Sequence, residues 1–186
     1  MKLLVLGGEG QLGRSFKSLA GVEHEVLSLA RSDCDITNAA NIDRICSPVN
    51  ADVVINCAAY TNVAKAESSE EEAMLVNGLG AKNLAEFCER YALPFVHIST
   101  DFVFDGSKVG AYTERDLTRP INIYGKSKAF GEQMVREYCS RHIILRTSWV
   151  FSEFGTNFLK TMLGLLKVKR HLRVVSDEFG NPFALH

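Results

Sequence analysis

The sequence lacks any apolar run that approaches the roughly 20 residues needed for a membrane-spanning helix. Residues 1–6 are too few for the apolar core of a signal peptide, and they lead directly into glycines. Neither a membrane partner nor secretion is therefore expected, and the sequence predicts a cytoplasmic protein.

A metal- or disulfide-binding pattern is also missing. The cysteines number five, and none forms a CxxC or CxxH motif. An odd count without such spacing argues against a disulfide framework and against a zinc site. The five histidines likewise show no metal-ligand spacing, so no metal ligands are expected. The cysteines are interpreted as small buried hydrophobic residues.

Neither positively nor negatively charged residues are in large excess. The chain has 21 Lys and Arg against 22 Asp and Glu, a net charge of −1, which disfavours a non-specific nucleic-acid partner. With 186 residues, 46% of them hydrophobic, it is long enough for one domain with a substantial core. No internal repeat, low-complexity segment or Gly/Ser linker marks a boundary, so residues 1–186 are expected to form a single unit.

Strand-like and helix-like segments alternate along the chain. Short apolar runs predict seven strands, at residues 2–6, 25–29, 34–36, 52–57, 95–99, 142–146 and 172–175. Helical spacing predicts helices after the first strand and at 38–47, 69–92, 122–141 and 156–169. Strands that are apolar throughout and separated by helices are typical of a parallel sheet covered on both faces. The predicted class is therefore α/β, with a doubly wound parallel sheet of about seven strands.

A glycine-rich loop follows the first predicted strand. Residues 7–13 read GGEGQLG, which fits both GxGxxG and GxxGxxG. Such glycines allow a tight turn, close approach of a pyrophosphate to the backbone, and packing of helix on strand. The order of strand, loop and helix favours a Rossmann-type dinucleotide site over the alternative of a glycine-rich turn without ligand.

Cofactor choice depends on residues after the second strand. An acidic side chain there suits the ribose of NAD, whereas an arginine suits the 2′-phosphate of NADP. Arg31 is the better placed candidate, so NADP(H) is the preferred cofactor. Asp33 keeps NAD(H) open, and a solvated surface arginine is the alternative for Arg31.

Tyr124 and Lys128 stand four residues apart in a predicted helix and so share one face. A nearby ammonium favours the phenolate, and we expect it to lower the pKa of Tyr124 toward the working range of an acid–base catalyst. Lys128 could also hold a nicotinamide ribose. The motif is weak alone, because a surface pair on an amphipathic helix has the same spacing.

The segment Ser99-Thr100-Asp101 follows a predicted strand, and strand carboxyl ends are where open α/β sheets bind ligands. A hydroxyl there can hydrogen-bond a substrate carbonyl. An N-cap or turn role is equally consistent with these residue types.

Together these stretches resemble the extended short-chain dehydrogenase/reductases, and within them the dTDP-4-dehydrorhamnose reductase family. The match extends over essentially the whole chain. Besides the glycine loop, it rests on NCAAYT at 56–61, HISTDFVFDG at 97–106, PINIYGKSK at 120–128 with Gly131-Glu132, RTSWV at 146–150 and DEFGNP at 177–182.

The resemblance implies a reaction and roles for residues. The 4-keto group of dTDP-4-dehydro-L-rhamnose would be reduced to give dTDP-L-rhamnose, a precursor of surface polysaccharide. Thr100, Tyr124 and Lys128 would be catalytic, with Asp101 and Trp149 contacting the nucleotide-sugar substrate. The cofactor would be held by Gly7, Gly10, Gln11, Leu12, Gly13, Arg31, Asp35, Ile36, Ala59, Tyr60, Thr61 and Ile98, together with Tyr124 and Lys128. Some members of the family bind Mg²⁺, and a homodimer is the candidate assembly.

The chain departs from the family pattern at three points. Ala64 stands where the family has an aspartate, and Phe183 where it has a threonine. The family also continues for roughly another hundred residues. Residues 1–186 are therefore expected to be the NAD(P)-binding domain, with the substrate domain largely absent. Two alternatives stay open: a non-catalytic regulatory subunit, like the β subunit of methionine adenosyltransferase, and a cofactor-binding but inactive fragment.

Overall fold

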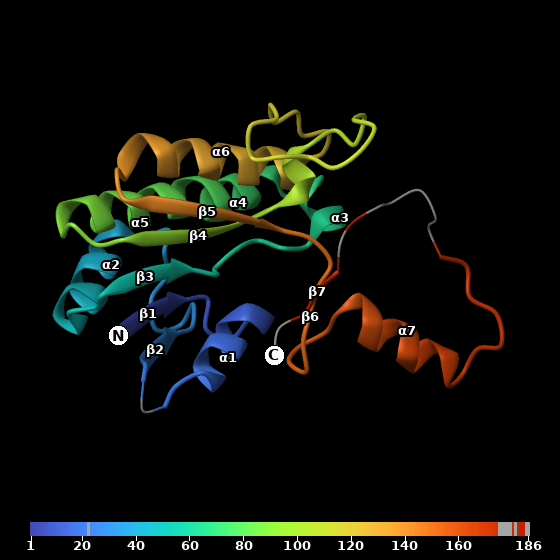
Figure 1. The fold of residues 1–186 in the computed structure, drawn as a ribbon, viewed down its shortest axis with the longest axis horizontal. Helices are drawn as coiled ribbons and strands as arrows, with labels where there is room; N and C mark the ends of the chain where they lie inside the picture. The colour runs from blue at the N-terminus through green and yellow to red at the C-terminus, as the bar shows by residue number, and fades with distance from the viewer. Residues whose placement is uncertain (22, 175–179, 181, 185–186) are drawn as a thin grey trace.

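A computed structural model describes residues 1–21, 23–174, 180 and 182–184 (Figure 1). Its centre is a parallel sheet of five strands in the order β2-β1-β3-β4-β5. The strands are β1 (Lys2–Leu6), β2 (Glu25–Leu29), β3 (Val53–Asn56), β4 (Phe95–Thr100) and β5 (His142–Thr147). The order reverses direction at β1, so β1 and β3 flank the topological switch point where such sheets bind ligands.

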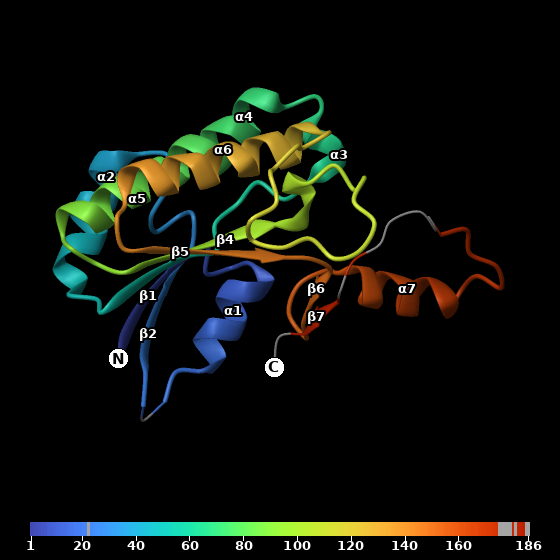
Figure 2. The ribbon, with the colours of Figure 1, turned by 45° about the horizontal axis from the view of Figure 1, so that its top comes forward.

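Helices cover the two faces of the sheet unequally. One face carries α2 (Ala39–Cys46), α5 (Gly80–Arg90) and α6 (Ile123–Tyr138), while α1 (Gln11–Ser18) lies on the other face against β1 and β2 (Figure 2). Short elements connect them. These are η1 (Ser47–Val49), α3 (Val63–Ala66), α4 (Glu70–Met74), the π-helical turn η2 (Leu75–Leu79) and the 3₁₀ turn η3 (Asp101–Val103). The doubly wound α/β class predicted from the sequence is confirmed.

Asparagine side chains fix where several helices begin. The Oδ1 atom of Asn122 accepts a hydrogen bond of 2.7 Å from the backbone N–H of Gly125, which starts α6. Asn38 caps α2 in the same way through the N–H of Asn41. Such caps satisfy N–H groups that the first helical turn cannot pair. The cap at Asn122 places Tyr124 in the first turn of α6.

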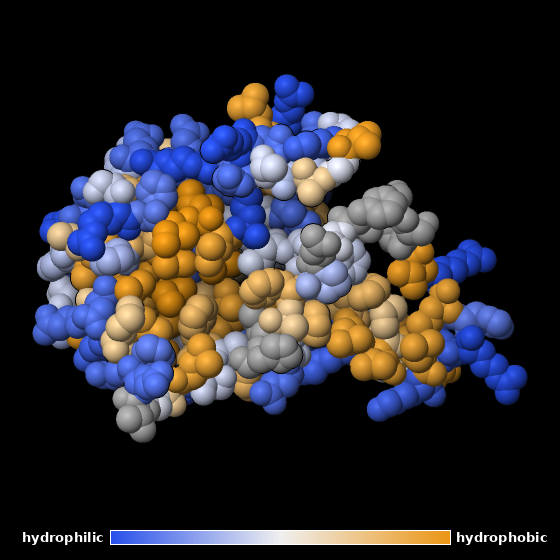
Figure 3. All heavy atoms as spheres, in the orientation of Figure 1, coloured by the Kyte–Doolittle hydropathy of each residue, from blue (hydrophilic) through white to orange (hydrophobic). Residues whose placement is uncertain are grey.

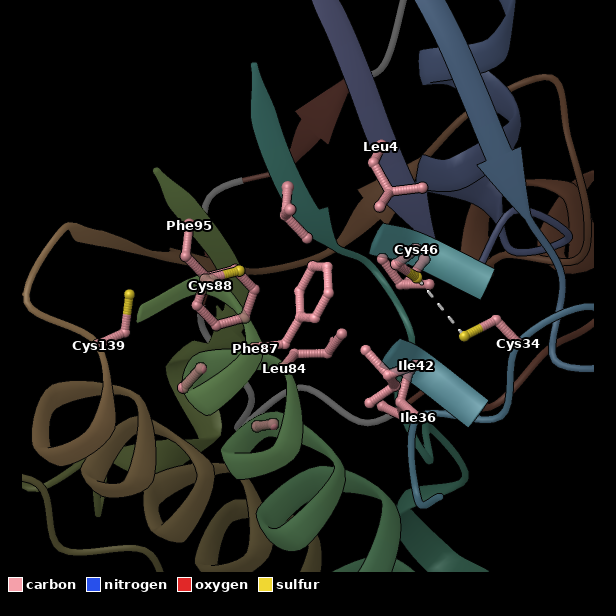
Figure 4. Close-up of a cluster of buried hydrophobic side chains, with 14 of the residues drawn as sticks. Leu4, Cys34, Ile36, Ile42, Cys46, Leu84, Phe87, Cys88, Phe95 and Cys139 are labelled. Carbon is pink, nitrogen blue, oxygen red and sulfur yellow. Dashed lines mark hydrogen bonds between the residues drawn. The ribbon is translucent and has the colours of Figure 1, made fainter. Parts of the chain in front are cut away.

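The core lies between the sheet and the helices α2 and α5 (Figure 4). Phe87 and Leu84 of α5 are buried against strand residues such as Leu4, and each such side chain contributes roughly 1.5–3 kcal/mol to folding. Four cysteines are buried here, as predicted, while Cys57 is half-buried. The Sγ atoms of Cys34 and Cys46 are 3.8 Å apart, and both are thiols.

Two predicted strands were wrong. Residues 34–36 form an irregular turn whose apolar side chains, Cys34 and Ile36, enter the core beside α2. Residues 172–174 are irregular too, and Val175 lies outside the described residues. The structure also contains a two-stranded sheet that was not predicted, in which β6 (Val150–Phe151) pairs with β7 (Phe183–Ala184).

Part of the sheet face beside α1 is exposed. Ile143 and Leu145 of β5 are 57% and 46% exposed. Figure 3 shows a broad apolar area on the face of the molecule seen in Figure 1. The helix α7 (Phe158–Leu166) projects beyond the sheet edge and has no buried residue. Across the described chain, no helix combines the length and apolar character that crossing a bilayer requires.

Candidate functional site

The glycine loop joins β1 to α1 at the switch point. Gly7 has φ +84°, and a Cβ there would lie 2.5 Å from the backbone nitrogen of Ala58. A Cβ on Gly13 would lie 2.3 Å from the carbonyl oxygen of Gly7. Only glycine permits these approaches, so the loop folds tightly under the start of α1. The first N–H groups of α1, which a helix leaves without intrahelical partners, follow directly after this loop.

A cavity of about 280 Å³ opens beside this loop. Its walls come from the glycine loop, the turn after β2 and the segment after β3. Of the cofactor residues predicted from the sequence, Gly7, Gly10, Arg31, Asp35, Ile36, Ala59, Tyr60 and Thr61 line it. Gln11, Leu12, Gly13, Ile98, Tyr124 and Lys128 are not among its lining residues. Glu9, Cys34, Cys57, Ala58 and Val76 complete the wall, and their identities gave no signal in the sequence.

The turn after β2 places two candidate side chains at the cavity. Arg31 is 66% exposed and lies 3.5 Å from Asp35 and 3.9 Å from Glu72. Burial alone would raise the pKa of Asp35, but hydrogen bonds from Thr37 and the charge of Arg31 outweigh it and lower the pKa. Asp33 instead accepts the backbone N–H of Ala30 at 2.8 Å, which uses its carboxylate within the turn.

The wall formed by Tyr60 is held by a buried asparagine. Asn77, 1% exposed in the π-helical turn η2, accepts the N–H of Tyr60 at 2.8 Å and donates to its carbonyl at 3.1 Å. It also donates to the Ser127 hydroxyl at 2.9 Å. Single π-turns inside helices recur at functional sites. Here the turn connects the cavity wall to α6.

Gln11 makes a contact that its place in the glycine motif does not predict. Its Oε1 accepts from the Asn157 side chain at 3.0 Å and from the Ser152 hydroxyl at 3.3 Å. Asn157 also caps α7 through the N–H of Lys160. The segment after β6 is thereby tied to the glycine loop, across most of the length of the chain.

The Thr100 hydroxyl, at the carboxyl end of β4, donates a hydrogen bond of 3.1 Å to Oδ1 of Asp101 and is close enough to Tyr124 to lower the pKa of its phenol. Thr100 is 6% exposed, and it also accepts the N–H of Phe102 at 3.3 Å as the cap of η3. The turn interpretation of this segment is confirmed, because Thr100 caps η3, and the hydrogen bond of its hydroxyl to a substrate carbonyl stays a prediction.

Lys128 lies one helical turn beyond Tyr124 and is 2% exposed. Its Nζ donates a hydrogen bond of 2.7 Å to the carbonyl oxygen of Ile98. Burial lowers the pKa of Lys128 to about 8, although the charge of Glu132 acts in the opposite direction. The ammonium is thus confined beneath the end of β4.

The expectation for the tyrosine was wrong in direction. Burial raises the pKa of Tyr124 above its ordinary value, and the charge of Asp101 adds to the rise. The hydrogen bond from Thr100 lowers it, but by less. The phenol therefore keeps its proton at neutral pH, which suits a proton donor.

The candidate substrate residues follow neighbouring strands. Asp101 follows β4, Trp149 follows β5, and these parallel strands pair with Thr100 opposite Thr147. Their carboxyl ends share one edge of the sheet, so both side chains stand at the edge that carries Tyr124. Trp149 has φ +48° and packs edge-on against Phe158, with ring centroids 5.0 Å apart.

Two polar residues at this edge were given no functional role by sequence reasoning. Glu132 is fully buried below Lys128, and Asn157 is 9% exposed beside the glycine loop. Glu132 follows the tyrosine and lysine at helical spacing, a signal that could have identified it. Asn157 offers no local signal. Among the described residues, no group of three or more His, Cys, Asp or Glu side chains could hold a metal ion.

Comparison with known proteins agrees with this geometry. The family model described as the RmlD substrate binding domain matches residues 1–185. A dTDP-4-dehydrorhamnose reductase of Aggregatibacter actinomycetemcomitans is 46% identical over 183 residues, covering 97% of this chain and 62% of the relative. The chain therefore spans less than two thirds of that relative's length.

Solved structures of dTDP-4-dehydrorhamnose reductases also superpose closely on this chain. A dTDP-4-dehydrorhamnose reductase from Bacillus anthracis, in complex with NADP, superposes with a TM-score of 0.96 at 36% identity. The superposition covers 99% of this chain and 66% of that one. A Clostridium acetobutylicum structure described as a dTDP-4-dehydrorhamnose reductase superposes with a TM-score of 0.95 at 40% identity, covering 100% and 66%.

Proposed function

The chain belongs to the family of the RmlD substrate binding domain, and from that premise we propose that it takes part in the NAD(P)H-dependent reduction of a keto sugar nucleotide. The specific reaction is reduction of the 4-keto group of dTDP-4-dehydro-L-rhamnose to dTDP-L-rhamnose. The observation that carries the proposal is the placement of Tyr124 one helical turn before a buried Lys128, whose Nζ donates to the Ile98 carbonyl two residues before Thr100. The names of the relatives support the substrate class.

The cavity beside the glycine loop suits a dinucleotide. A side chain at Gly7 would collide with Ala58, so the backbone is bare where a pyrophosphate would approach. Gln11 and Leu12 begin α1, whose N-terminus attracts anions. Asp35 and Ile36 would flank the adenine, and Ala59, Tyr60 and Thr61 would line the nicotinamide side. Arg31 would face a 2′-phosphate, which makes NADPH the preferred cofactor and NADH the alternative.

Three side chains would take part in the transfer of a proton to the ketone oxygen. When bound, the reduced nicotinamide supplies a hydride to the carbonyl carbon. Thr100 would donate a hydrogen bond to the ketone oxygen, and Tyr124 would give its proton to that oxygen as the carbonyl becomes an alcohol. Lys128, held by the Ile98 carbonyl, would stabilise the tyrosinate that remains and hold the nicotinamide ribose.

Substrate residues are proposed at the same edge. Asp101 and Trp149 would contact the sugar nucleotide, and residues 1–186 would form the cofactor-binding domain that presents it to the acid–base group. Because the described residues contain no cluster that would hold a metal, we propose no role for Mg²⁺. A homodimer and a cytoplasmic location stay predictions from the sequence.

The test is NADPH oxidation by the purified chain with enzymatically prepared dTDP-4-dehydro-L-rhamnose. We expect turnover by the wild type and a loss of about 100-fold or more in Tyr124→Phe, since general acid catalysis contributes about 10²–10⁴-fold. Tyr138→Phe on the same helix is the matched control and should keep wild-type activity.

Cofactor binding is measured in parallel by the fluorescence of NADPH. Binding with no turnover, in both the wild type and Tyr124→Phe, would favour the non-catalytic alternative over the reductase. Absence of NADPH binding would contradict the proposed cofactor site itself.

A further inference from the structure

A buried carboxylate lies beneath the proposed acid–base pair. Glu132 is fully buried and stands one helical turn beyond Lys128 and two beyond Tyr124, so the three side chains share one stripe of α6. A carboxylate with no exposure is costly unless charged partners compensate it. The proposed proton transfer makes no use of this group, so its presence at this position needs another explanation.

The partners of Glu132 come from three elements. Oε1 accepts from the Ser99 hydroxyl at 2.6 Å and from Nε of Arg146 at 2.8 Å. Oε2 accepts from Arg146 at 2.6 Å and from Arg136 at 2.8 Å. The carboxylate therefore joins α6 to the ends of β4 and β5. Ser99 is the residue before Thr100, so this contact fixes the strand end that carries the Thr100 hydroxyl.

The charge of Glu132 also acts on Lys128. From β4 and the segment after β3, Lys128 faces His97 and Cys57. Burial keeps His97 neutral by lowering its pKa, and raises the pKa of Cys57 to about 12, so neither carries charge near neutral pH. Tyr124, on the same helix, keeps its proton. Of these neighbours, Glu132 is the one that is negatively charged.

The carboxylate itself stays ionised. Burial alone would raise the pKa of Glu132, but the hydrogen bonds from Arg146, Ser99 and Arg136 outweigh it and lower the pKa. Arg146 and Arg136 face it from β5 and from α6 itself, and Ser99 faces it from β4. Glu132 thus presents a permanent negative charge to the buried ammonium.

We propose that Glu132 is a positioning residue for the Thr100–Tyr124–Lys128 set: it holds the end of β4 against α6 and keeps the buried Lys128 in its charged form. The inference rests on the proposed reductase function for its use in catalysis, but the contacts stand without it. Neutralising Glu132 would leave Lys128 buried without its anionic neighbour, and the lysine would lose its proton at a lower pH.

The test follows the Lys128 ammonium by ¹⁵N NMR between pH 6 and 10, with Lys128→Met to assign its signal. We expect a wild-type midpoint near 8. In Glu132→Gln the midpoint should fall by about one pH unit or more. Glu137→Gln removes an exposed carboxylate from the same helix and should leave the midpoint unchanged. Glu132→Asp keeps the charge and should restore most of the wild-type midpoint.

NADPH affinity provides a second readout. At pH 7.5, Glu132→Gln should bind NADPH about threefold more weakly than the wild type, and the difference should shrink at pH 6, where Lys128 regains its proton. A purely structural role would give a loss that does not depend on pH in this way. An unchanged Lys128 midpoint in Glu132→Gln overturns the proposal.

The remaining outcomes are also decisive. If Glu132→Gln does not fold, the Lys128 titration is compared between the wild type and Glu132→Asp. Titration midpoints near pH 8 in both proteins support the proposal, and a wild-type midpoint below about pH 7 overturns it. Failure of the reductase function would appear as absent turnover while the Lys128 titration stayed as expected. The two failures are therefore distinguishable.

Discussion

Asn77 and Tyr60 are joined by two hydrogen bonds: the side-chain amide of Asn77 pairs with both the backbone N–H and the backbone carbonyl of Tyr60. The N–H of Tyr60 donates to Oδ1 at 2.8 Å, and Nδ2 donates to its carbonyl at 3.1 Å. A single buried side chain thereby fixes a stretch of irregular backbone that lines the cavity. Because this backbone forms no strand, the asparagine supplies the pairing that a neighbouring strand would otherwise provide.

The first prediction concerns this pairing. Asn77→Ala leaves the backbone groups of Tyr60 without their partner, so the free energy of unfolding should fall by about 2 kcal/mol and NADPH affinity by about tenfold. Asn38→Ala removes a helix cap away from the cavity and should cost about 1 kcal/mol with unchanged affinity. Thermal melts and fluorescence titrations measure both. Equal affinity losses in the two variants would contradict the role given to Asn77.

A second prediction concerns the packing of α1 on β1. In Gly13→Ala the added methyl group would lie 2.3 Å from the Gly7 carbonyl, so α1 must move away from the loop. We expect a loss of at least about 2 kcal/mol of stability and a strong loss of NADPH binding. Gly21→Ala has no atom within 4 Å of its Cβ and is the control. Gly13→Ala binding NADPH as tightly as Gly21→Ala would refute the proposed phosphate loop.

Cofactor preference provides a third prediction. Arg31→Gln should weaken NADPH binding by about 10- to 100-fold, the value of a charge-assisted hydrogen bond of about 1.5–3 kcal/mol, and leave NADH binding unchanged. Arg44→Gln, on the exposed face of α2, serves as the comparison. Calorimetric titration with both cofactors separates the two effects. If both affinities fall equally, Arg31 does not contact a 2′-phosphate.

The fourth prediction concerns acid stability. His97 is fully buried, and burial holds its pKa well below 6.5, with the charge of Lys128 adding to the effect. Below pH 6.5 the unfolded chain binds a proton at this histidine that the folded chain does not. Stability should therefore fall as the pH drops from 6.5 to 5, by up to about 1.4 kcal/mol per pH unit from this group.

Urea denaturation of the wild type and His97→Gln at several pH values measures this slope. The glutamine cannot titrate, so its slope in that range should be shallower by one proton. Parallel pH profiles for the wild type and His97→Gln would contradict the neutral buried state of His97.

The parts of the fold that local sequence determines were predicted correctly. The five strands of the main sheet and the helix that carries Tyr124 and Lys128 came from apolar runs and helical spacing, which record burial directly. The same reasoning failed at residues 34–36. Cys34 and Ile36 alternate like a strand, but their burial comes from a turn packed on α2 rather than from pairing in the sheet.

The sequence could not predict contacts between distant segments or the effect of burial on side-chain pKa values. Gln11 meets Asn157 across 146 positions, and nothing near either residue indicates the other. The expected lowering of the Tyr124 pKa considered only the charge of a neighbouring lysine. In the structure, Lys128 donates to the Ile98 carbonyl, and the burial of the phenol dominates its pKa.

The position of β1 at the middle of the sheet has a consequence for folding. It pairs with β2 on one side and, as Leu3 with Val53, with β3 on the other, and both of these strands are synthesised after it. The sheet contains no hairpin, so each ladder closes only after a helical connection has been synthesised. Such long loop closures slow folding. The ladder between β1 and β3 therefore closes only after the chain has been synthesised through β3, whereas the ladder between β1 and β2 can close earlier.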